Sequence, residues 1–306
     1  MKAVFIERFG GPEVLEYGDL PDAVAGPGDV VIDVVAASVN GADWKVRSGQ
    51  YKQSMFPLVL GRDFSGTVGA IGQGVADFAV GDAVFGVLEA GREGTYAEKL
   101  AVKAAIIAGK PAALPHVDAA ALALAGLTAL SSVEDTLKLK AGETILIQGG
   151  AGGVASFAIQ LAKHLGAHVI TTARAENHAY LREIGADEII DYTASDFTQI
   201  GPRCDAVFDT VGGDVAQGSF AVLKPGGRAA FVASGPQAPK PDRDDVQALR
   251  PPVGRARRPL ERIAELFTAG ALRAPQIKLY RLSEAADAHR LSESRHFRGK
   301  LVFQVR

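Results

Sequence analysis

Short hydrophobic runs separated by glycine fill the first part of the chain. Residues 30–36 form a nearly unbroken apolar run, residues 61–69 alternate glycine with larger residues, and residues 80–86 resume an apolar pattern. Runs of this length predict short β-strands joined by tight turns. We therefore expect a barrel-like or sandwich β domain over residues 1–112.

From residue 113 the apolar spacing alternates between the period of a helix and that of a strand. Helical spacing covers residues 119–130, 154–165 and 179–184, and strand-like runs cover residues 144–148, 168–172, 189–190, 206–209 and 229–233. This alternation predicts a doubly wound parallel sheet with crossover helices over residues 113–245. The expected fold class is therefore α/β.

The last part of the chain, residues 246–306, is expected to return to the first domain. A proline-rich stretch over residues 236–258 predicts an irregular loop, which we expect to form part of the wall of a substrate pocket. Residues 259–269 have the spacing of a helix, and residues 301–303 have that of a closing strand.

Composition and charge limit the classes of protein that need to be considered. A chain of 306 residues with 47% hydrophobic and 22% charged residues is long enough for two folded domains. Its net charge of −2 gives no bulk attraction to polyanions, so no nucleic-acid partner is expected. Arg250, Arg255, Arg257 and Arg258 are the one local excess of positive charge. They are interpreted as a solvated loop and helix flank, with a phosphate-binding patch as the alternative.

Nothing in the sequence predicts a secretory signal or a membrane segment. Glu7 interrupts the apolar start of the chain, and the apolar run over residues 119–130 is shorter than the roughly 18 residues that a membrane helix needs. A cytoplasmic location is therefore expected. Cys204 is the single cysteine, which excludes a disulfide framework or a four-cysteine zinc lobe and predicts a buried thiol.

A glycine-rich turn follows the strand expected over residues 144–148. Gly150, Ala151, Gly152, Gly153, Val154 and Ala155 read G-x-G-x-x-A, a form of the dinucleotide-binding fingerprint. Its glycines let the backbone approach a pyrophosphate, and the helix that follows offers unpaired N–H groups to the phosphates. A glycine-rich turn in any α/β protein is the alternative, but the strand–turn–helix context favours a nucleotide site.

The end of the next strand indicates which dinucleotide binds. An NAD site places an acidic residue roughly 20 residues after the fingerprint, where it binds the ribose hydroxyls. Here the strand ends with Thr172, Ala173 and Arg174, with Glu176 nearby. An arginine can pair with a 2′-phosphate, which a carboxylate would repel. NADPH is therefore the expected cofactor, and a solvated strand-end residue is the alternative interpretation of Arg174.

Taken together, these segments resemble the quinone oxidoreductase branch of the medium-chain dehydrogenase/reductase superfamily. The resembling segments are residues 37–49, 61–66, 125–129, 149–154, 208–213, 223–227 and 298–302. They occur in order and cover essentially the whole chain. The resemblance implies a GroES-like β-barrel domain and a Rossmann-fold domain, with the cofactor in a cleft between them.

Departures from the zinc-dependent alcohol dehydrogenases of that superfamily determine the expected chemistry. Those enzymes carry a cysteine near position 38 and Gly-His-Glu at positions 61–63, where this chain has Ser38 and Gly-Arg-Asp. No metal is therefore expected. Without a Lewis acid, the hydride acceptor should be a quinone or an α,β-unsaturated carbonyl, because its developing oxyanion needs only hydrogen bonds.

The resemblance also implies two candidate catalytic residues, Asn40 and Lys45, at the floor of the cleft. Asn40 is expected either to bind a carbonyl or to shape a strand end, and Lys45 to contact either the substrate or the cofactor. At the position of Lys45, enzymes similar to the plant enone reductases carry lysine, whereas quinone reductases often carry tyrosine. This resemblance favours an enone as the substrate. Asp43 is expected to support Lys45 or Arg47. Arg62 is expected either to line the cleft or to form a salt bridge with Asp63 or another acid.

Further cofactor contacts are implied by the resemblance alone. Thr128 would hold the nicotinamide carboxamide, and Tyr192 would flank the adenosine phosphate. The nicotinamide pocket would be lined by Val211, Val232 and Ser234 and crossed by His296, Phe297 and Arg298. Core packing at strand ends is the alternative for the two valines.

These expectations favour NADPH-dependent reduction of a small quinone or enone by hydride transfer. An enoyl-thioester reductase is a rival, because the arginines between positions 250 and 258 could form a basic mouth for a carrier phosphate. A non-catalytic NADPH-binding regulator is a second rival. The resemblance also makes a homodimer through the open edge of the Rossmann sheet an expectation.

Overall fold

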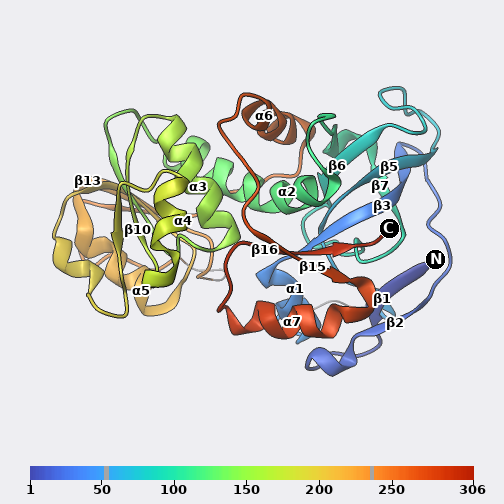
Figure 1. Ribbon diagram of the computed structural model, residues 1–306, viewed down its shortest axis with the longest axis horizontal. Helices are drawn as coiled ribbons and strands as arrows, with labels where there is room; N and C mark the ends of the chain where they lie inside the picture. Colours follow the sequence, from blue (N-terminus) through green and yellow to red (C-terminus); the bar gives the residue numbers. More distant parts are fainter. Residues whose placement is uncertain (52–54, 235–237) are drawn as a thin grey trace. The chain divides into compact units, whose positions relative to one another are not determined.

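The computed structural model describes residues 1–51, 55–234 and 238–306 of the chain (Figure 1). These residues form two compact units. Unit 1 comprises Met1–Leu124, Arg255–Gly270 and Ala274–Arg306, and unit 2 comprises Ala125–Gly254 and Ala271–Arg273.

The predicted domain boundaries, 1–112, 113–245 and 246–306, differ from those of the two units. Helix α2 (His116–Leu130) accounts for the first difference, because its Ala120 and Ala121 are buried in one cluster with Ala36 and Val302 of unit 1. Strand β14 (Gln247–Leu249) accounts for the second difference, because it pairs with a strand of unit 2. The chain therefore changes unit inside a helix rather than in a linker.

Among the described residues of unit 1, the largest sheet has seven strands. In order they are β15 (Ile277–Arg281), β16 (Lys300–Gln304), β3 (Asp29–Val39), β5 (Asp63–Ile71), β6 (Ala83–Val87) and β8 (Ile107–Gly109), with β7 (Lys99–Lys103) beside β3. A smaller sheet contains β2 (Glu16–Asp19), β1 (Lys2–Ile6) and β4 (Leu58–Val59).

Two strand predictions for this unit are confirmed and one is shifted. The apolar run over residues 30–36 lies within β3, and residues 301–303 lie within β16, which pairs antiparallel with β3 and so returns the end of the chain to unit 1. The strand expected over residues 80–86 begins only at Ala83, because Asp82 accepts a hydrogen bond from the backbone of Ala79 in a turn.

Three helices of unit 1 besides α2 bear on the site: α1 (Gly41–Arg47), α6 (Arg257–Thr268) and α7 (Ala285–Ser294). The helix expected over residues 259–269 is confirmed as α6. Helix α7 was not predicted, because its buried positions are occupied by small or polar residues, among them Ala285, Ala288 and His289. The short 3₁₀ turns of unit 1 are Pro12–Val14, Ala104–Ile106 and Leu282–Glu284. Those of unit 2 are Ala175–Asn177, Phe197–Ile200 and Ser219–Val222.

Unit 2 is built on a six-stranded parallel sheet, counted over the described residues. Its order is β11 (Glu188–Ile190), β10 (His168–Thr172), β9 (Thr144–Ile147), β12 (Cys204–Asp209), β13 (Leu223–Phe231) and β14. Numbered within the unit this is 3-2-1-4-5-6, the strand order of dinucleotide-binding Rossmann folds. The sequence order reverses between β9 and β12, where such folds bind ligands.

The helices of unit 2 connect these strands. They are α3 (Gly153–His164), α4 (His178–Glu183) and α5 (Gly213–Gly218), and a π-helical segment, Ser131–Thr136, continues α2. The expectation of an irregular stretch over residues 236–258 was wrong at β14, where three residues pair in parallel with β13. Residues 236 and 237 of that stretch lie outside the described part of the chain.

The continuous helix His116–Thr136 is long and apolar enough to cross a membrane by length and composition. However, 78% of its apolar window is buried inside the protein, as expected for a core helix. Of the described residues, no other helix has this length and hydropathy.

Candidate functional site

The glycine turn after β9 is held against the end of β10 by hydrogen bonds. The backbone N–H of Gly149 donates to Oγ1 of Thr172 (3.0 Å), and that of Gly150 donates to the carbonyl oxygen of Thr172 (3.0 Å). A Cβ atom on Gly150 would lie 2.2 Å from Oγ1 of Thr171. A side chain at Gly150 would clash with that of Thr171, so the site favours glycine. Thr172, expected to contact the cofactor, thus holds the turn with its hydroxyl, which also donates to Gln148 (2.7 Å).

Helix α3 begins directly after this turn with its first N–H groups uncapped by a side chain. Its N-cap residue is Gly152, which has no side chain to cap the first turn. The N–H groups of the first turn of a helix have no partner within the helix, and the helix dipole is positive at this end. Gly150, Ala151, Gly152, Gly153 and Val154 therefore form a turn that fits a dinucleotide pyrophosphate at the reversal point of the sheet.

Two residues predicted to contact the cofactor meet beyond the tip of β10. Nε of Arg174 donates a hydrogen bond to the phenol oxygen of Tyr192 (3.0 Å), although 18 residues separate them. Both side chains are exposed, and Tyr192 has half of its surface accessible (50%). Arg174 thus keeps its terminal nitrogens on an open surface beside an aromatic hydroxyl. This pair can bind a ribose 2′-phosphate by charge and hydrogen bonding.

The ends of β12 and β13 carry the residues expected at the nicotinamide. Val211 is partly exposed (37%) beyond β12, so it is not a core residue, and Val232 is half-buried at the end of β13. Asp209, buried at the end of β12, accepts hydrogen bonds from the backbone of Val211 and Gly212, and burial raises its pKa. Oγ of Ser234 is buried without a hydrogen-bond partner in the described part of the chain. An orphaned hydroxyl of this kind is open to a ligand.

Thr128 and the C-terminal residues remain predictions as cofactor contacts. The carbonyl oxygen of Thr128 accepts a hydrogen bond from Ser132 (2.7 Å), which ties it into the helix. His296 and Arg298 are exposed residues between α7 and β16, whereas Phe297 packs against the core of unit 1. All three of these C-terminal residues belong to unit 1.

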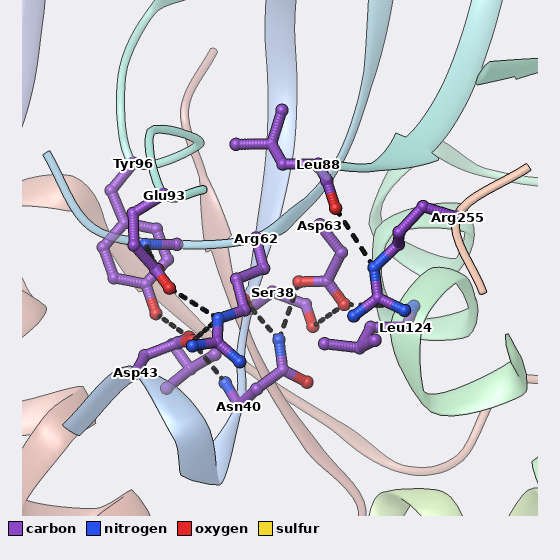
Figure 2. A network of polar contacts seen from close by, with 12 residues as sticks. Ser38, Asn40, Asp43, Arg62, Asp63, Leu88, Glu93, Tyr96, Leu124 and Arg255 are labelled. Carbon is purple, nitrogen blue, oxygen red and sulfur yellow. Dashed lines mark hydrogen bonds and ion pairs between the residues drawn. The ribbon is translucent and has the colours of Figure 1, made fainter. Parts of the chain in front are cut away.

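Asn40 lies in a buried polar network in unit 1 (Figure 2). Its Oδ1 accepts a hydrogen bond from Nζ of Lys300 (2.7 Å), and its Nδ2 donates to Oδ1 of Asp63 (2.9 Å) and more weakly to the carbonyl oxygen of Ser38 (3.4 Å). The amide of Asn40 is therefore committed on both sides. This geometry favours the interpretation in which Asn40 shapes the end of β3, and its catalytic role stays a prediction.

Asp63 is the hub of this network. Besides Asn40, it accepts hydrogen bonds from Oγ of Ser38 (3.1 Å) and from the backbone N–H of Leu124 (3.3 Å). Burial raises the pKa of Asp63 to about 6, and the charge of Lys300 opposes that shift. Burial in turn lowers the pKa of Lys300, whose ammonium is fully enclosed. The salt bridge expected between Arg62 and Asp63 or another acid is present, and its partner is Glu93 (2.6 Å) rather than Asp63.

A second branch of the network surrounds Asp43. Oδ2 of Asp43 accepts hydrogen bonds from the N–H of Asn40 (2.8 Å) and from the hydroxyl of Tyr96 (2.6 Å), so it caps α1 instead of supporting Lys45 or Arg47. Nε of Arg62 donates to Oε1 of Glu93 (2.6 Å). Burial, reinforced by Asp43, raises the pKa of Glu93 to about 7.

Lys45 projects from α1 towards aromatic rings. Its Nζ lies 5.7 Å from the ring centre of Trp44 and 5.8 Å from that of Tyr51, within range of cation–π attraction. The side chain is half-buried. Its expected contact with substrate or cofactor therefore stays a prediction.

Sequence reasoning missed three members of the network, Glu93, Tyr96 and Lys300. No local pattern marks them, because each is defined by a partner far along the chain: Lys300 and Asn40 are 260 residues apart, and Tyr96 and Asp43 are 53 apart. The arginines near position 255 are likewise explained by pairing. Nη1 of Arg257 pairs with Asp77 (2.9 Å), and Nη1 of Arg258 pairs with Glu265 (2.6 Å).

The side chains at the position of a catalytic zinc do not fit that metal. Ser38 donates its hydroxyl to Asp63, Arg62 pairs with Glu93, and the charge of Lys300 acts on Asp63. Zinc sites are built from thiolates, imidazoles and carboxylates free to coordinate. The described residues contain no group of three or more His, Cys, Asp or Glu side chains that could hold a metal ion. The described side chains at this position therefore do not form a zinc ligand set.

Comparison with known proteins agrees with this architecture. A family model described as an alcohol dehydrogenase GroES-like domain matches residues 26–112, and one described as a zinc-binding dehydrogenase matches residues 184–303. A quinone oxidoreductase of Pseudomonas aeruginosa is 33% identical over 98% of this chain and 98% of its own length. A chloroplastic NADPH-dependent alkenal/one oxidoreductase of Arabidopsis thaliana is 37% identical, over 74% of this chain and 61% of its own length.

A solved structure shows the same fold over the whole chain. The quinone oxidoreductase of Coxiella burnetii matches with a TM-score of 0.92 and 36% identity, covering 100% of this chain and 99% of the other. A GroES-like unit joined to a Rossmann unit with a dinucleotide turn defines a medium-chain dehydrogenase/reductase. The chain belongs to the quinone oxidoreductase and enone reductase branch of that superfamily, which confirms the resemblance found in the sequence.

Proposed function

We propose that this protein is an NADPH-dependent oxidoreductase that reduces a quinone or an α,β-unsaturated carbonyl compound without a metal ion. The observation that carries the proposal is the hydrogen bond between Arg174 and Tyr192. It lies in the unit that also carries the glycine turn, where a Cβ on Gly150 would clash with Thr171. The relatives named quinone oxidoreductase and NADPH-dependent alkenal/one oxidoreductase support the same class of reaction.

The residues of unit 2 would divide the binding of NADPH among themselves. The turn from Gly150 to Val154 would hold the pyrophosphate through backbone N–H groups. Arg174 and Tyr192 would bind the 2′-phosphate. Val211 would border the nicotinamide together with the hydroxyl of Ser234, which has no hydrogen-bond partner among the described residues. When bound, NADPH supplies the hydride.

The chain's own contribution to the chemistry is positioning and electrostatics. Addition of hydride to the electron-poor carbon of an enone shifts the double-bond electron pair towards the carbonyl, whose oxygen becomes negative. Hydrogen-bond donors fixed in the protein stabilise that oxygen, and water supplies the proton that completes the reduction. Fixed donors act more strongly in a site shielded from water than they would in solution.

We propose further that the protein forms a homodimer through the β14 edge of the unit 2 sheet. Strand β14 is the last in the order of strands among the described residues, and it pairs with β13 on one side. An open edge of this kind presents unpaired backbone groups to a second copy. Size-exclusion chromatography with light-scattering detection gives the molar mass of the protein in solution and would distinguish a dimer from a monomer.

The catalytic proposal is tested by mixing the purified protein with NADPH and a panel of acceptors. The panel contains 1,4-benzoquinone, an unsubstituted enone, a saturated ketone and an α,β-unsaturated acyl thioester. Oxidation of NADPH is followed by the loss of the absorbance band of its reduced nicotinamide. We expect turnover with the quinone or the enone and none with the saturated ketone. NADPH binding without oxidation by any acceptor would contradict the proposal, and turnover confined to the thioester would identify the rival enoyl-thioester reductase.

A further inference from the structure

Arg62 stands on a backbone segment that the fold holds rigidly. Gly61, directly before it, has a φ of +93°, and a Cβ there would lie 2.2 Å from the ring of Tyr96. The carbonyl oxygen of Gly61 accepts a hydrogen bond from the N–H of Gly94 (2.9 Å), and the carbonyl oxygen of Arg62 accepts one from the N–H of Leu88 (2.8 Å). The Cα of Arg62 is therefore fixed from both sides of the chain.

The guanidinium of Arg62 is anchored through only one of its nitrogens. Nε donates to Oε1 of Glu93 at 2.6 Å and lies 3.8 Å from Oδ1 of Asp43. Both carboxylates are fully buried, whereas the Arg62 side chain is 18% exposed. Glu93 is itself held, because its second oxygen accepts the N–H of Gly61 (3.1 Å). The anchor therefore sets the direction of the guanidinium plane.

The two terminal nitrogens of Arg62, Nη1 and Nη2, have no acceptor among residues 1–51, 55–234 and 238–306. Neither is a sealed interior atom, because the buried polar atoms that lack a partner do not include them. In Figure 2 the guanidinium end of Arg62 points away from Glu93 and in the direction of Asn40. A charged, partly exposed donor held by its inner nitrogen is arranged to bind an incoming acceptor.

We infer that Arg62 is the catalytic residue that binds the carbonyl oxygen of the acceptor and stabilises the oxyanion formed when hydride adds. This inference rests on the proposed function and identifies the group that does in this chain what the zinc ion does in metal-dependent relatives. In the reaction, the hydride forms the new C–H bond and the carbon–carbon π pair moves towards the carbonyl carbon. The carbonyl π pair then becomes the charge on oxygen, which the Nη groups bind until water protonates the product.

Other donors in the network are less suited to this role. Both hydrogen-bonding directions of the Asn40 amide are occupied by Lys300 and Asp63. The hydroxyl of Ser38 donates to Asp63 (3.1 Å), and that of Tyr96 donates to Asp43 (2.6 Å). Within the described network, Arg62 thus keeps donors that no internal group uses.

The variant Arg62→Lys separates this role from a purely structural one. Its ammonium would stand near the position of the Arg62 Cζ, within reach of Glu93, so the buried ion pair and the fold would be retained. The two Nη nitrogens that extend beyond Cζ would be lost, so the remaining N–H donors would lie farther from a bound acceptor. A structural role for Arg62 therefore predicts nearly unchanged activity, whereas the inferred role predicts a loss of roughly 10- to 100-fold in kcat/KM, the size of a hydrogen bond to a charged group.

A second variant covers the case in which the lysine substitution unfolds the protein. Arg62→Gln combined with Glu93→Gln removes both charges of the pair and leaves the net charge of the network unchanged. Arg92→Gln is the matched control, because Arg92 is an exposed arginine paired with Glu89 on the same segment. Thermal unfolding of all four proteins establishes which of them are folded.

Two readouts distinguish the outcomes. The first is kcat/KM for an enone and for 1,4-benzoquinone: we expect a larger loss with the enone, because the quinone product spreads its charge over an aromatic ring. The second needs no turnover: binding of 4-nitrophenolate, an enolate-like anion, followed by its absorbance with and without NADP⁺. We expect the affinity for 4-nitrophenolate to fall by roughly tenfold or more in the Arg62 variants and to stay unchanged in Arg92→Gln.

Folded Arg62 variants that keep wild-type kcat/KM and wild-type affinity for 4-nitrophenolate would overturn the inference. Equal losses with the enone and the quinone, together with unchanged phenolate binding, would also overturn it and indicate a structural role. Failure of the wild type to oxidise NADPH with any acceptor would instead overturn the proposed function. In that case the phenolate measurement would still decide whether Arg62 binds an oxyanion.

Discussion

The ammonium of Lys300 lies 2.7 Å from Oδ1 of Asn40, which fixes the orientation of an amide at the end of β3. Lysine can only donate and a carboxylate at Asp63 accepts, so the oxygen of Asn40 must face Lys300 and the nitrogen must face Asp63. Nζ of Lys300 also donates to the carbonyl oxygen of Val39 (3.0 Å). A residue six positions from the C-terminus thus positions the predicted catalytic asparagine near the N-terminus.

Replacement of Lys300 by methionine should destabilise the protein by about 3–5 kcal/mol, because it leaves the buried Asp63 without its counter-charge and Asn40 without a donor. Urea unfolding at pH 7.5 measures the change. Lys278→Met is the control: Lys278 is exposed on the neighbouring strand β15, and its replacement should change the free energy of unfolding by less than about 0.5 kcal/mol. Equal midpoints for the two variants would refute the charge network.

Gly61 and Gly81 provide a matched pair for the rigidity of the segment that carries Arg62. Their φ angles are nearly the same, +93° and +95°, so an alanine meets similar backbone strain at both sites. At Gly81 nothing lies within 4 Å of the new Cβ, whereas at Gly61 the ring of Tyr96 lies at 2.2 Å. Gly81→Ala should cost about 1 kcal/mol. Gly61→Ala should cost several times as much or prevent folding, as measured by thermal unfolding.

The buried Glu93 should make stability fall as the pH rises through neutrality. Its folded pKa of about 7 lies above the ordinary glutamate value of 4.5, so its contribution to stability is complete below pH 4.5 and is lost as the pH rises through 7. The difference in unfolding free energy between the wild type and Glu93→Gln should therefore shift in favour of the variant between pH 5 and pH 8. The shift should be up to about 3 kcal/mol.

Comparing the wild type with Glu93→Gln also removes the effect of His289, whose titration changes the free energy of unfolding in the opposite direction. Burial lowers the pKa of His289 from 6.5 to about 3, so its contribution is present above pH 6.5 and is lost as the pH falls. This histidine is present in both proteins and drops out of the difference. A difference that is constant from pH 5 to pH 8 would show that Glu93 does not titrate in that window.

The parts of the site that could be predicted from the sequence are formed by residues adjacent along the chain. The strand, glycine turn and helix around Gly150 follow one another along the chain, and each has its own local signal. Strand β10 was predicted with the bounds that the structure has, because its apolar run is short and ends at a polar tip. Residues Arg174 and Tyr192 were assigned separately, and their hydrogen bond is a result of the fold.

The parts that were missed depend on partners that no local pattern reveals. The anchor of Arg62 is Glu93, 31 residues later, and nothing around Glu93 distinguishes it from an acid in an exposed loop. Helix α7 escaped prediction because it buries Ala285 and Ala288, which carry little hydrophobic signal. Strand β14 lies among prolines and pairs over only three residues, too few for a periodic pattern.

Arg174→Gln should convert the protein from an NADPH-selective to a nearly unselective binder. The substitution removes the charge that faces the 2′-phosphate, so the Kd for NADPH should rise by roughly 10- to 100-fold while that for NADH changes little. Arg203→Gln is the matched control, because Arg203 is an exposed arginine of unit 2 that pairs with Glu188 (2.6 Å). Cofactor fluorescence titration measures both affinities.

Tyr192→Phe should have a smaller effect in the same direction, about two- to fivefold, because the phenol oxygen only orients Arg174 through its hydrogen bond (3.0 Å). The order of the two effects is the informative result. If Tyr192→Phe weakened NADPH binding as much as Arg174→Gln while leaving NADH binding intact, the phenol rather than the guanidinium would be the main ligand of the phosphate. If neither variant altered the ratio of the two affinities, the 2′-phosphate would have to bind elsewhere on unit 2, and the selectivity inferred from the tip of β10 would be wrong.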